Sequence, residues 1–132
     1  MDYCHCRVRN RKVMKYKLVI FDMDGTILDT LEDLADATNY ALHQNGFSER
    51  TIDEIRRFVG NGIIKLIERA CPENTPDEVR ENVRRSFVSY YGEHCADHTK
   101  PYEGIPELLH GSVKNSNHFS NSRYSLTIFT ED

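Results

Sequence analysis

Residues 16–30 read YKLVIFDMDGTILDT, and this stretch decides the fold. The run Leu18–Phe21 is rich in residues that favour a buried strand. Asp22 and Asp24 follow directly, so two carboxylates stand close together where the predicted strand ends. Gly25 comes next and allows the backbone to turn sharply and to approach a ligand closely. The stretch therefore predicts a strand of an α/β core that ends in a turn bearing two acids.

This pair of carboxylates suits phosphoryl transfer. One carboxylate can attack phosphorus and form an acyl-phosphate, which splits a difficult hydrolysis into two easier steps. The second can protonate the leaving alcohol and later take a proton from water. Because two anions repel a phosphate, the site needs a cation such as magnesium, which takes oxygen ligands. The alternative interpretation is an ordinary acidic turn after a strand, and Thr26 and Asp29 complete a longer pattern that disfavours it.

The full pattern resembles the first motif of the haloacid dehalogenase-like hydrolase superfamily, in its phosphoglycolate phosphatase-like branch. The resemblance implies a Rossmann-like α/β core with an α-helical cap bundle inserted just after this motif. It implies that Asp22 is the nucleophile, that Asp24 is the general acid–base, and that Gly25 and Thr26 lie along the phosphate. Mg²⁺ would be held by the Asp22 carboxylate and the Asp24 main-chain carbonyl. The implied substrates are small phosphomonoesters such as 2-phosphoglycolate.

The composition fits one small folded domain of 132 residues, with 39% hydrophobic and 29% charged residues. A net charge of −4 disfavours nucleic-acid binding. The sequence has no apolar run long enough to span a membrane and no signal-peptide pattern. The cluster Cys4-His5-Cys6 lacks the paired spacing of a zinc site. We therefore expect free thiols and a cytoplasmic location.

The chain divides into three parts by composition. Residues 1–13 are basic and lack apolar periodicity, which predicts a disordered N-terminal extension with Met14 as the natural start. The alternative is a basic arm for an anionic partner. Residues 14–29 and 101–132 are assigned to a partial α/β core, and residues 30–100 to the helical cap.

Four helices are predicted in the assigned cap, because apolar residues recur there at helical spacing. They are a helix over residues 30–45, a short helix after Thr51 with Ile52, Ile55 and Phe58 on one face, a third that ends near Ala70, and a long one from about Pro76 to His94. Thr51 and Glu54 form a capping box for the second helix, and Thr75 is expected to cap the fourth. Their apolar stripes can pack against one another as a small bundle.

A glycine-containing loop, Gly60-Asn61-Gly62, separates the second and third predicted helices. Amides at a helix N-terminus are exposed there, and the helix dipole favours an anion. By the resemblance this segment faces the substrate, so Asn61 and Gly62 are candidates for holding the substrate's non-reacting end. Lys65 and Arg69 could add positive charge. The alternative is an ordinary turn between helices.

The resemblance continues through residues 101–109, PYEGIPELL, which are expected to return the chain to the core with a helix from Pro106. Residues 110–132 then bring Gly111 and a polar run of Ser and Asn, which favours loops. One strand-like segment, residues 125–130, can pair with the first strand, which needs parallel neighbours in such a core.

The other three motifs of the family have no secure place in this sequence. These are a hydroxyl that binds phosphate, a lysine, and late acids that complete the magnesium shell. We therefore expect a truncated or frame-shifted chain with little or no activity alone. Two alternatives are a non-catalytic fragment that binds another protein through unsatisfied core surface, and half of a split enzyme whose partner chain supplies the missing motifs.

Overall fold

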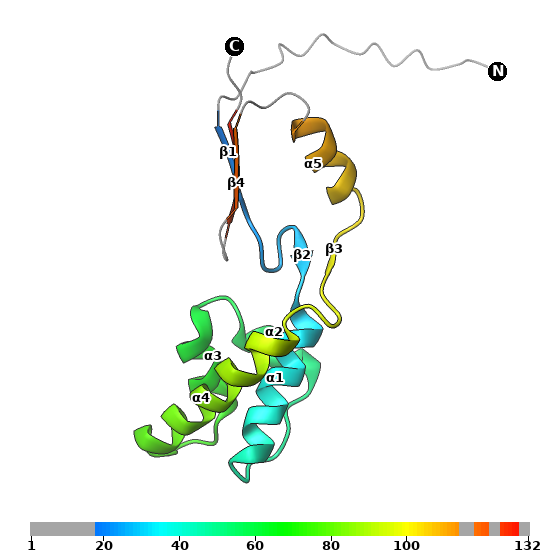
Figure 1. The fold of residues 1–132 in the computed structure, drawn as a ribbon. Helices are drawn as coiled ribbons and strands as arrows, with labels where there is room; N and C mark the ends of the chain where they lie inside the picture. The colour runs from blue at the N-terminus through cyan, green and yellow to red at the C-terminus, as the bar shows by residue number, and fades with distance from the viewer. Residues whose placement is uncertain (1–17, 114–117, 122–124, 130–132) are drawn as a thin grey trace, which may run out of the picture.

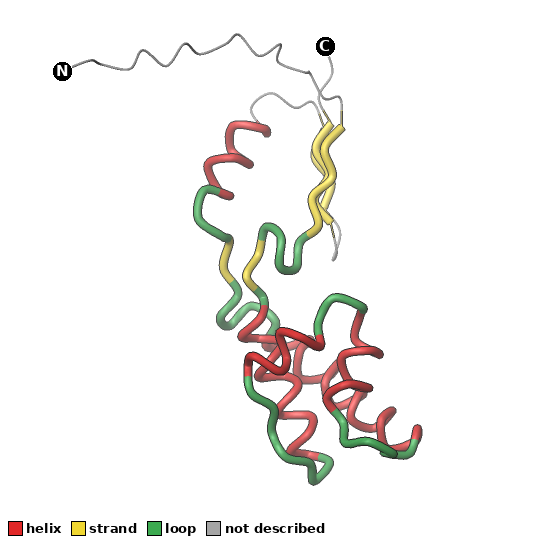
Figure 2. The backbone as a smooth tube through the Cα atoms, turned by 180° about the vertical axis from the view of Figure 1, so that it is seen from behind, coloured by secondary structure: helices red, strands yellow, loops and turns green. Residues whose placement is uncertain are grey.

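The computed structural model describes residues 18–113, 118–121 and 125–129, and the described elements form two regions (Figure 1). One region holds four helices, α1 (Leu31–Gln44), α2 (Ile52–Phe58), α3 (Gly62–Ala70) and α4 (Asp77–His94). The other holds helix α5 (Ile105–Val113) and strands β1 (Leu18–Asp22), β4 (His118–Asn121) and β5 (Ser125–Phe129). Two short strands, β2 (Leu28–Asp29) and β3 (Lys100–Pro101), run between the regions, as Figure 2 shows.

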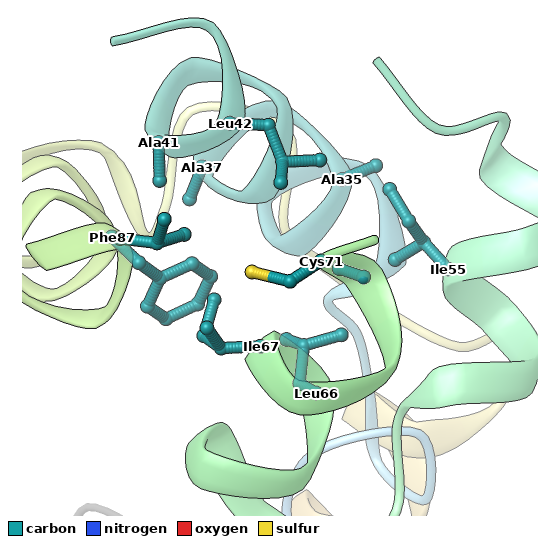
Figure 3. Packing of buried hydrophobic residues seen from close by; sticks show 11 residues of the cluster. Ala35, Ala37, Ala41, Leu42, Ile55, Leu66, Ile67, Cys71 and Phe87 are labelled. Atoms are coloured by element: carbon teal, nitrogen blue, oxygen red, sulfur yellow. The ribbon is translucent and has the colours of Figure 1, made fainter. Parts of the chain in front are cut away.

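The four predicted helices of the bundle are confirmed, and they bury one continuous apolar cluster. Figure 3 shows Leu42 of α1, Ile55 of α2, Ile67 of α3 and Phe87 of α4 facing one another. These four side chains are fully or almost fully buried. The Cys71 sulfur points into the same cluster, and burial raises the pKa of its thiol. The apolar stripes read from the sequence are thus the faces that hold the bundle together.

The predicted helix starts are right for α2 and wrong in one detail for α4. The Thr51 hydroxyl accepts a hydrogen bond from the Glu54 amide, and the Glu54 carboxylate accepts one from the Thr51 amide, so the capping box is present. Thr75 does not cap α4, because its hydroxyl donates to the Pro72 carbonyl at 2.7 Å. Pro76 occupies the N-cap position instead, without a side-chain hydrogen bond.

The described sheet has the strand order β1-β5-β4, and both pairs are antiparallel. The predicted partner strand is confirmed at Ser125–Phe129, but it pairs antiparallel with β1, where parallel neighbours were expected. The polar run that favoured loops contains β4, and α5 continues through Gly111 to Val113. Three residues separate β4 from β5 in the sequence, which suits an antiparallel pair, because a parallel pair needs a long crossover. The long stretch between β1 and β5 sets no such limit, so the antiparallel direction of that pair is a property of the folded chain.

The connections between the two regions pair as a narrow ribbon. Strand β2 pairs antiparallel with β3, so Leu28 faces Pro101 and Asp29 faces Lys100. Ile27, just before β2, is buried and packs against apolar side chains of β1 and α5. The chain therefore leaves and re-enters the strand region at one place.

A buried carboxylate ties the returning segment to the start of the bundle. Asp33 in the first turn of α1 is 2% exposed. Its carboxylate accepts hydrogen bonds from the His98 amide at 2.8 Å, the Thr99 amide at 2.8 Å and the Thr99 hydroxyl at 2.6 Å. Hydrogen bonds to an ionised acceptor are among the stronger ones in proteins. Asp33 thus holds the segment before β3 beside the helix that follows β2.

Some predictions fall on residues that the structure does not describe. The predicted extension at residues 1–13, the start at Met14, the Cys4-His5-Cys6 cluster and Thr130 lie outside the described residues. Within the described part of the chain, no helix is both long enough and apolar enough to cross a bilayer.

We expect Asp33→Ala to lower the free energy of unfolding by about 2–4 kcal/mol, because it removes a buried carboxylate and with it the acceptor of three hydrogen bonds from His98 and Thr99. Urea denaturation measures this loss, and amide exchange at His98 and Thr99 should accelerate. The control is Gln44→Ala at the exposed end of α1, which should change stability by less than about 0.5 kcal/mol. Equal stability of the two variants would contradict the role given to Asp33.

Candidate active site

The turn after β1 is closed by hydrogen bonds to one carbonyl. The Met23 carbonyl accepts from the amides of Thr26 at 3.3 Å, Ile27 at 3.1 Å and Leu28 at 3.0 Å. The Gly25 amide donates to the Leu28 carbonyl at 2.8 Å. Gly25 has a φ of +70°, a left-handed conformation that favours glycine. These contacts hold the two acidic residues in one short loop at the end of the strand.

Asp22 and Asp24 both lie in this turn and are exposed. The Asp22 carboxylate accepts a hydrogen bond from the Met23 amide at 3.0 Å. The pKa of Asp24 is raised, first because neighbouring groups displace water from its carboxyl and second because the negative charge of Asp22 is close. The sequence prediction that the two acids share one site is therefore consistent with the geometry of the turn.

Thr30 is a residue of this site that the sequence reasoning missed. It is 5% exposed and precedes α1. A hydrogen bond between its side chain and Asp24 lowers the pKa of Asp24, against the two effects that raise it. The sequence analysis placed Thr30 at the start of the predicted helix over residues 30–45; in the structure it is the N-cap of α1, and its side chain makes no cap hydrogen bond to the helix.

The bundle also approaches this turn through Tyr91 of α4. Tyr91 is half-buried, and its ring stacks on Phe87 with centroids 5.4 Å apart. Burial is the main reason that its pKa rises to about 12, and the negative charge of Asp24 is the second. The phenol therefore stays protonated at neutral pH and lies within electrostatic range of the acidic turn.

Gly25 and Thr26, the predicted phosphate contacts, use their amides within the turn. Both amides donate to main-chain carbonyls of the same loop, at 2.8 Å and 3.3 Å. Both residues are exposed. The Thr26 hydroxyl is therefore the donor on these two residues that is best placed to meet an incoming phosphate.

Asn61 and Gly62 lie in the bundle, in the loop between α2 and α3. In both views this loop lies at the end of the bundle nearest to β1 and the acidic turn (Figures 1 and 2). Within the described residues, no hydrogen bond or ion pair joins this loop to the turn. Lys65 is paired with Glu68 at 2.6 Å, so its charge is directed along α3.

The acidic turn offers oxygen atoms that could bind a metal ion, but few of them belong to carboxylates. Among the described residues, no group of three or more His, Cys, Asp and Glu side chains gathers as a metal site. Asp22 and Asp24 nevertheless present two carboxylates, and the pKa of Asp24 is raised first by partial burial and second by the negative charge of Asp22. Two close carboxylates fit a hard divalent cation as part of its ligand set.

A cavity of about 520 Å³ lies elsewhere, between α1 and α4. Tyr40, Tyr90 and His94 line it, and each neighbouring pair of these rings stacks with centroids 4.3 Å apart. None of the site residues predicted from the sequence lines this cavity. The candidate site is therefore the open acidic turn and not this cavity.

Comparison with known proteins adds the family to this geometry. The sequence model of the haloacid dehalogenase-like hydrolases matches residues 19–130. The chain belongs to the haloacid dehalogenase-like hydrolase family. This membership confirms the resemblance stated from the first motif and the predicted α/β fold class.

Relatives of this haloacid dehalogenase-like chain are named as phosphatases. It is 39% identical over 97 residues to phosphoglycolate phosphatase of Chromobacterium violaceum, and the match covers 70% of this chain and 44% of the relative. It is 37% identical over 98 residues to N-acetylmuramic acid 6-phosphate phosphatase of Pseudomonas aeruginosa, and the match covers 74% of this chain and 43% of the relative. The chain spans less than half of the length of these curated relatives.

A solved structure supports the same branch of the family. A protein of Lactobacillus delbrueckii subsp. bulgaricus, provisionally assigned as a phosphoglycolate phosphatase, is 34% identical with a TM-score of 0.66. The match covers 74% of this chain and 50% of that protein. The likeness places this chain in the phosphoglycolate phosphatase-like branch.

We expect the pKa of Asp24 to fall in Asp22→Asn, because this change removes the neighbouring negative charge. It should rise in Thr30→Val, because that change removes the hydroxyl that lowers it. NMR titration of the ¹³C-labelled carboxyl group measures both shifts. A change in the same direction in the two variants would contradict this account of the site.

Proposed function

We propose that this chain supplies the nucleophile and the general acid–base of a magnesium-dependent phosphatase that acts on small phosphomonoesters. One observation supports this most: Asp22 and Asp24 share an exposed turn at the end of β1, and the pKa of Asp24 is raised. A raised pKa suits Asp24 to general acid–base catalysis, because its carboxyl group holds a proton up to a higher pH than an ordinary aspartate.

The reaction would proceed in two steps. An Asp22 oxygen attacks phosphorus, the bond from phosphorus to the leaving oxygen breaks, and Asp24 gives its proton to that oxygen. The product of this step is an aspartyl-phosphate and a free alcohol. Asp24 then takes a proton from a water molecule that attacks phosphorus, which releases inorganic phosphate and restores the Asp22 carboxylate.

Magnesium would be held by the Asp22 carboxylate and the Asp24 main-chain carbonyl. When bound, it would offset the negative charge of the phosphate and of the acids. Gly25 and Thr26 would lie along the phosphate, and the Thr26 hydroxyl would donate to one of its oxygens. Thr30 would keep Asp24 oriented through their hydrogen bond.

The helical bundle would act as a cap, made of residues 30–100, on a core formed from residues 14–29 and 101–132. Its α2–α3 loop would then meet the part of the substrate that does not react, through Asn61 and Gly62. The relatives' names point to phosphorylated metabolites, and 2-phosphoglycolate is the candidate substrate. The buried thiol of Cys71 suits a reducing compartment such as the cytoplasm.

A second candidate is a non-catalytic or split protein that acts by binding another chain. Strand β1 lies at one edge of the described sheet. Ile20 on this strand is 62% exposed. An edge strand with an exposed apolar side chain can accept a strand from a partner, and that partner could supply further motifs of the fold.

We expect the reaction to form a detectable aspartyl-phosphate on Asp22 even where turnover is slow. The chain is incubated with p-nitrophenyl phosphate and magnesium, quenched in acid, and analysed by mass spectrometry for phosphate on Asp22. Asp22→Asn should abolish the modification and lower turnover at least about a hundredfold. Asp24→Asn should accumulate it, because p-nitrophenolate leaves without a proton while the hydrolysis of the intermediate still needs a base.

The absence of both turnover and modified Asp22 in the unmutated chain would overturn the catalytic proposal and favour the binding protein. Hydrogen exchange then tests the second candidate directly. We expect peptides that contain Leu18–Phe21 to be weakly protected in the isolated chain and strongly protected after a partner adds a strand. Strong protection of these peptides in the isolated chain would contradict the hypothesis that β1 is an unpaired edge to which a partner chain adds a strand.

A further inference from the structure

Arg69, near the end of α3, reaches back to the loop that precedes this helix. Its Nη1 donates to the Phe58 carbonyl at 2.8 Å, and its Nη2 donates to the Asn61 side-chain oxygen at 2.9 Å. Phe58 is the last residue of α2, and Asn61 is the N-cap of α3. One guanidinium group therefore joins the two ends of the α2–α3 loop. It can do so because its N–H donors are held in a rigid plane.

The loop has few other contacts that would fix its conformation. Asn61 occupies the N-cap position but makes no cap hydrogen bond to α3. Gly60 has a φ of +113°, a backbone conformation that favours glycine. A Cβ atom added there would have no neighbouring atom within 4 Å, so the loop is not packed against other residues at this point. All three residues from Gly60 to Gly62 are exposed. Without Arg69, the Asn61 side chain would rotate freely in solvent.

The neighbouring basic residues do not share this role. Lys65 is paired with Glu68, which lies one turn further along α3. Arg56 on α2 is paired with Asp53, and 61% of its side chain is exposed. Among the described basic residues, Arg69 is thus the one whose side chain hydrogen-bonds to Asn61.

We propose that Arg69 is a positioning residue that holds Asn61 and the α2–α3 loop in the conformation that meets the substrate. This inference rests on the proposed function, in which the loop contacts the non-reacting end of the substrate. The loop lies at the end of the bundle nearest to the acidic turn (Figures 1 and 2). Arg69 itself touches neither the phosphate nor the reacting aspartates, and it acts through Asn61.

Hydrogen exchange tests the positioning in the full chain without any need for activity. In Arg69→Met, amide exchange in a peptide that spans residues 58–64 should accelerate about tenfold or more, while peptides of α1 and α4 stay unchanged. Arg69→Lys should behave like Arg69→Met, because one ammonium group cannot span both acceptors. Arg56→Met removes a positive charge from the adjoining helix and should leave the peptide unchanged. Unchanged exchange in Arg69→Met would overturn the proposal.

Kinetics with two substrates test what the positioning is for. In Arg69→Met, KM for 2-phosphoglycolate should rise about tenfold with kcat within about twofold. Both parameters for phenyl phosphate should stay within about twofold, because its phenyl ring offers the Asn61 amide no polar partner. Faster loop exchange with an unchanged KM for 2-phosphoglycolate would overturn the role in substrate binding. If the unmutated chain hydrolyses neither ester and forms no phosphorylated Asp22, the proposed function fails, and the exchange result still decides whether Arg69 holds the loop.

Discussion

The buried carboxylate of Asp33 accepts three hydrogen bonds from His98 and Thr99, and the relation between the two regions of the chain depends on them. The bundle is connected to the strand region at two points, near β2 and near β3. Asp33 holds the second connection beside the helix that begins after the first. The pairing of Leu28 with Pro101 continues this contact toward the acidic turn. The bundle is therefore joined to the strand region through two short segments, β2 and β3, which pair with each other.

The acidic turn itself depends on a balance of effects on one carboxyl group. Partial burial and the charge of Asp22 raise the pKa of Asp24, whereas Thr30 lowers it. Thr30 lies at the junction with α1, only three residues before Asp33. A change in the position of the bundle would thus alter the hydrogen bond to Asp24. The same short segment that connects the two regions therefore also influences the protonation of the candidate acid–base residue.

The sequence was informative wherever the physical signal lay within one element. The recurrence of apolar residues at helical spacing predicted α1 to α4. The Thr51–Glu54 pattern predicted a capping box that is present. Asp22 and Asp24 could be placed at a strand end because the apolar run stops there. Thr75 shows the limit of this reasoning, since its hydroxyl was expected to accept a hydrogen bond from an amide of the fourth helix. Only the folded loop determines that the hydroxyl donates to the Pro72 carbonyl instead. The polar segment that holds β4 gave no strand signal, because pairing with β5 and not its own composition makes it a strand.

By itself, the sequence determined the family, the order of helices in the bundle and the two acids that the chemistry would use. These features follow from residue types at short spacing, which are the same in any chain that shares the pattern. Only the tertiary structure decided that Thr30 contacts Asp24, that Asp33 binds residues 98 and 99, and that Arg69 holds Asn61. It also decided the antiparallel direction of β5. Each of these contacts joins groups whose separation in space depends on how helices and strands pack, and local sequence does not encode that distance.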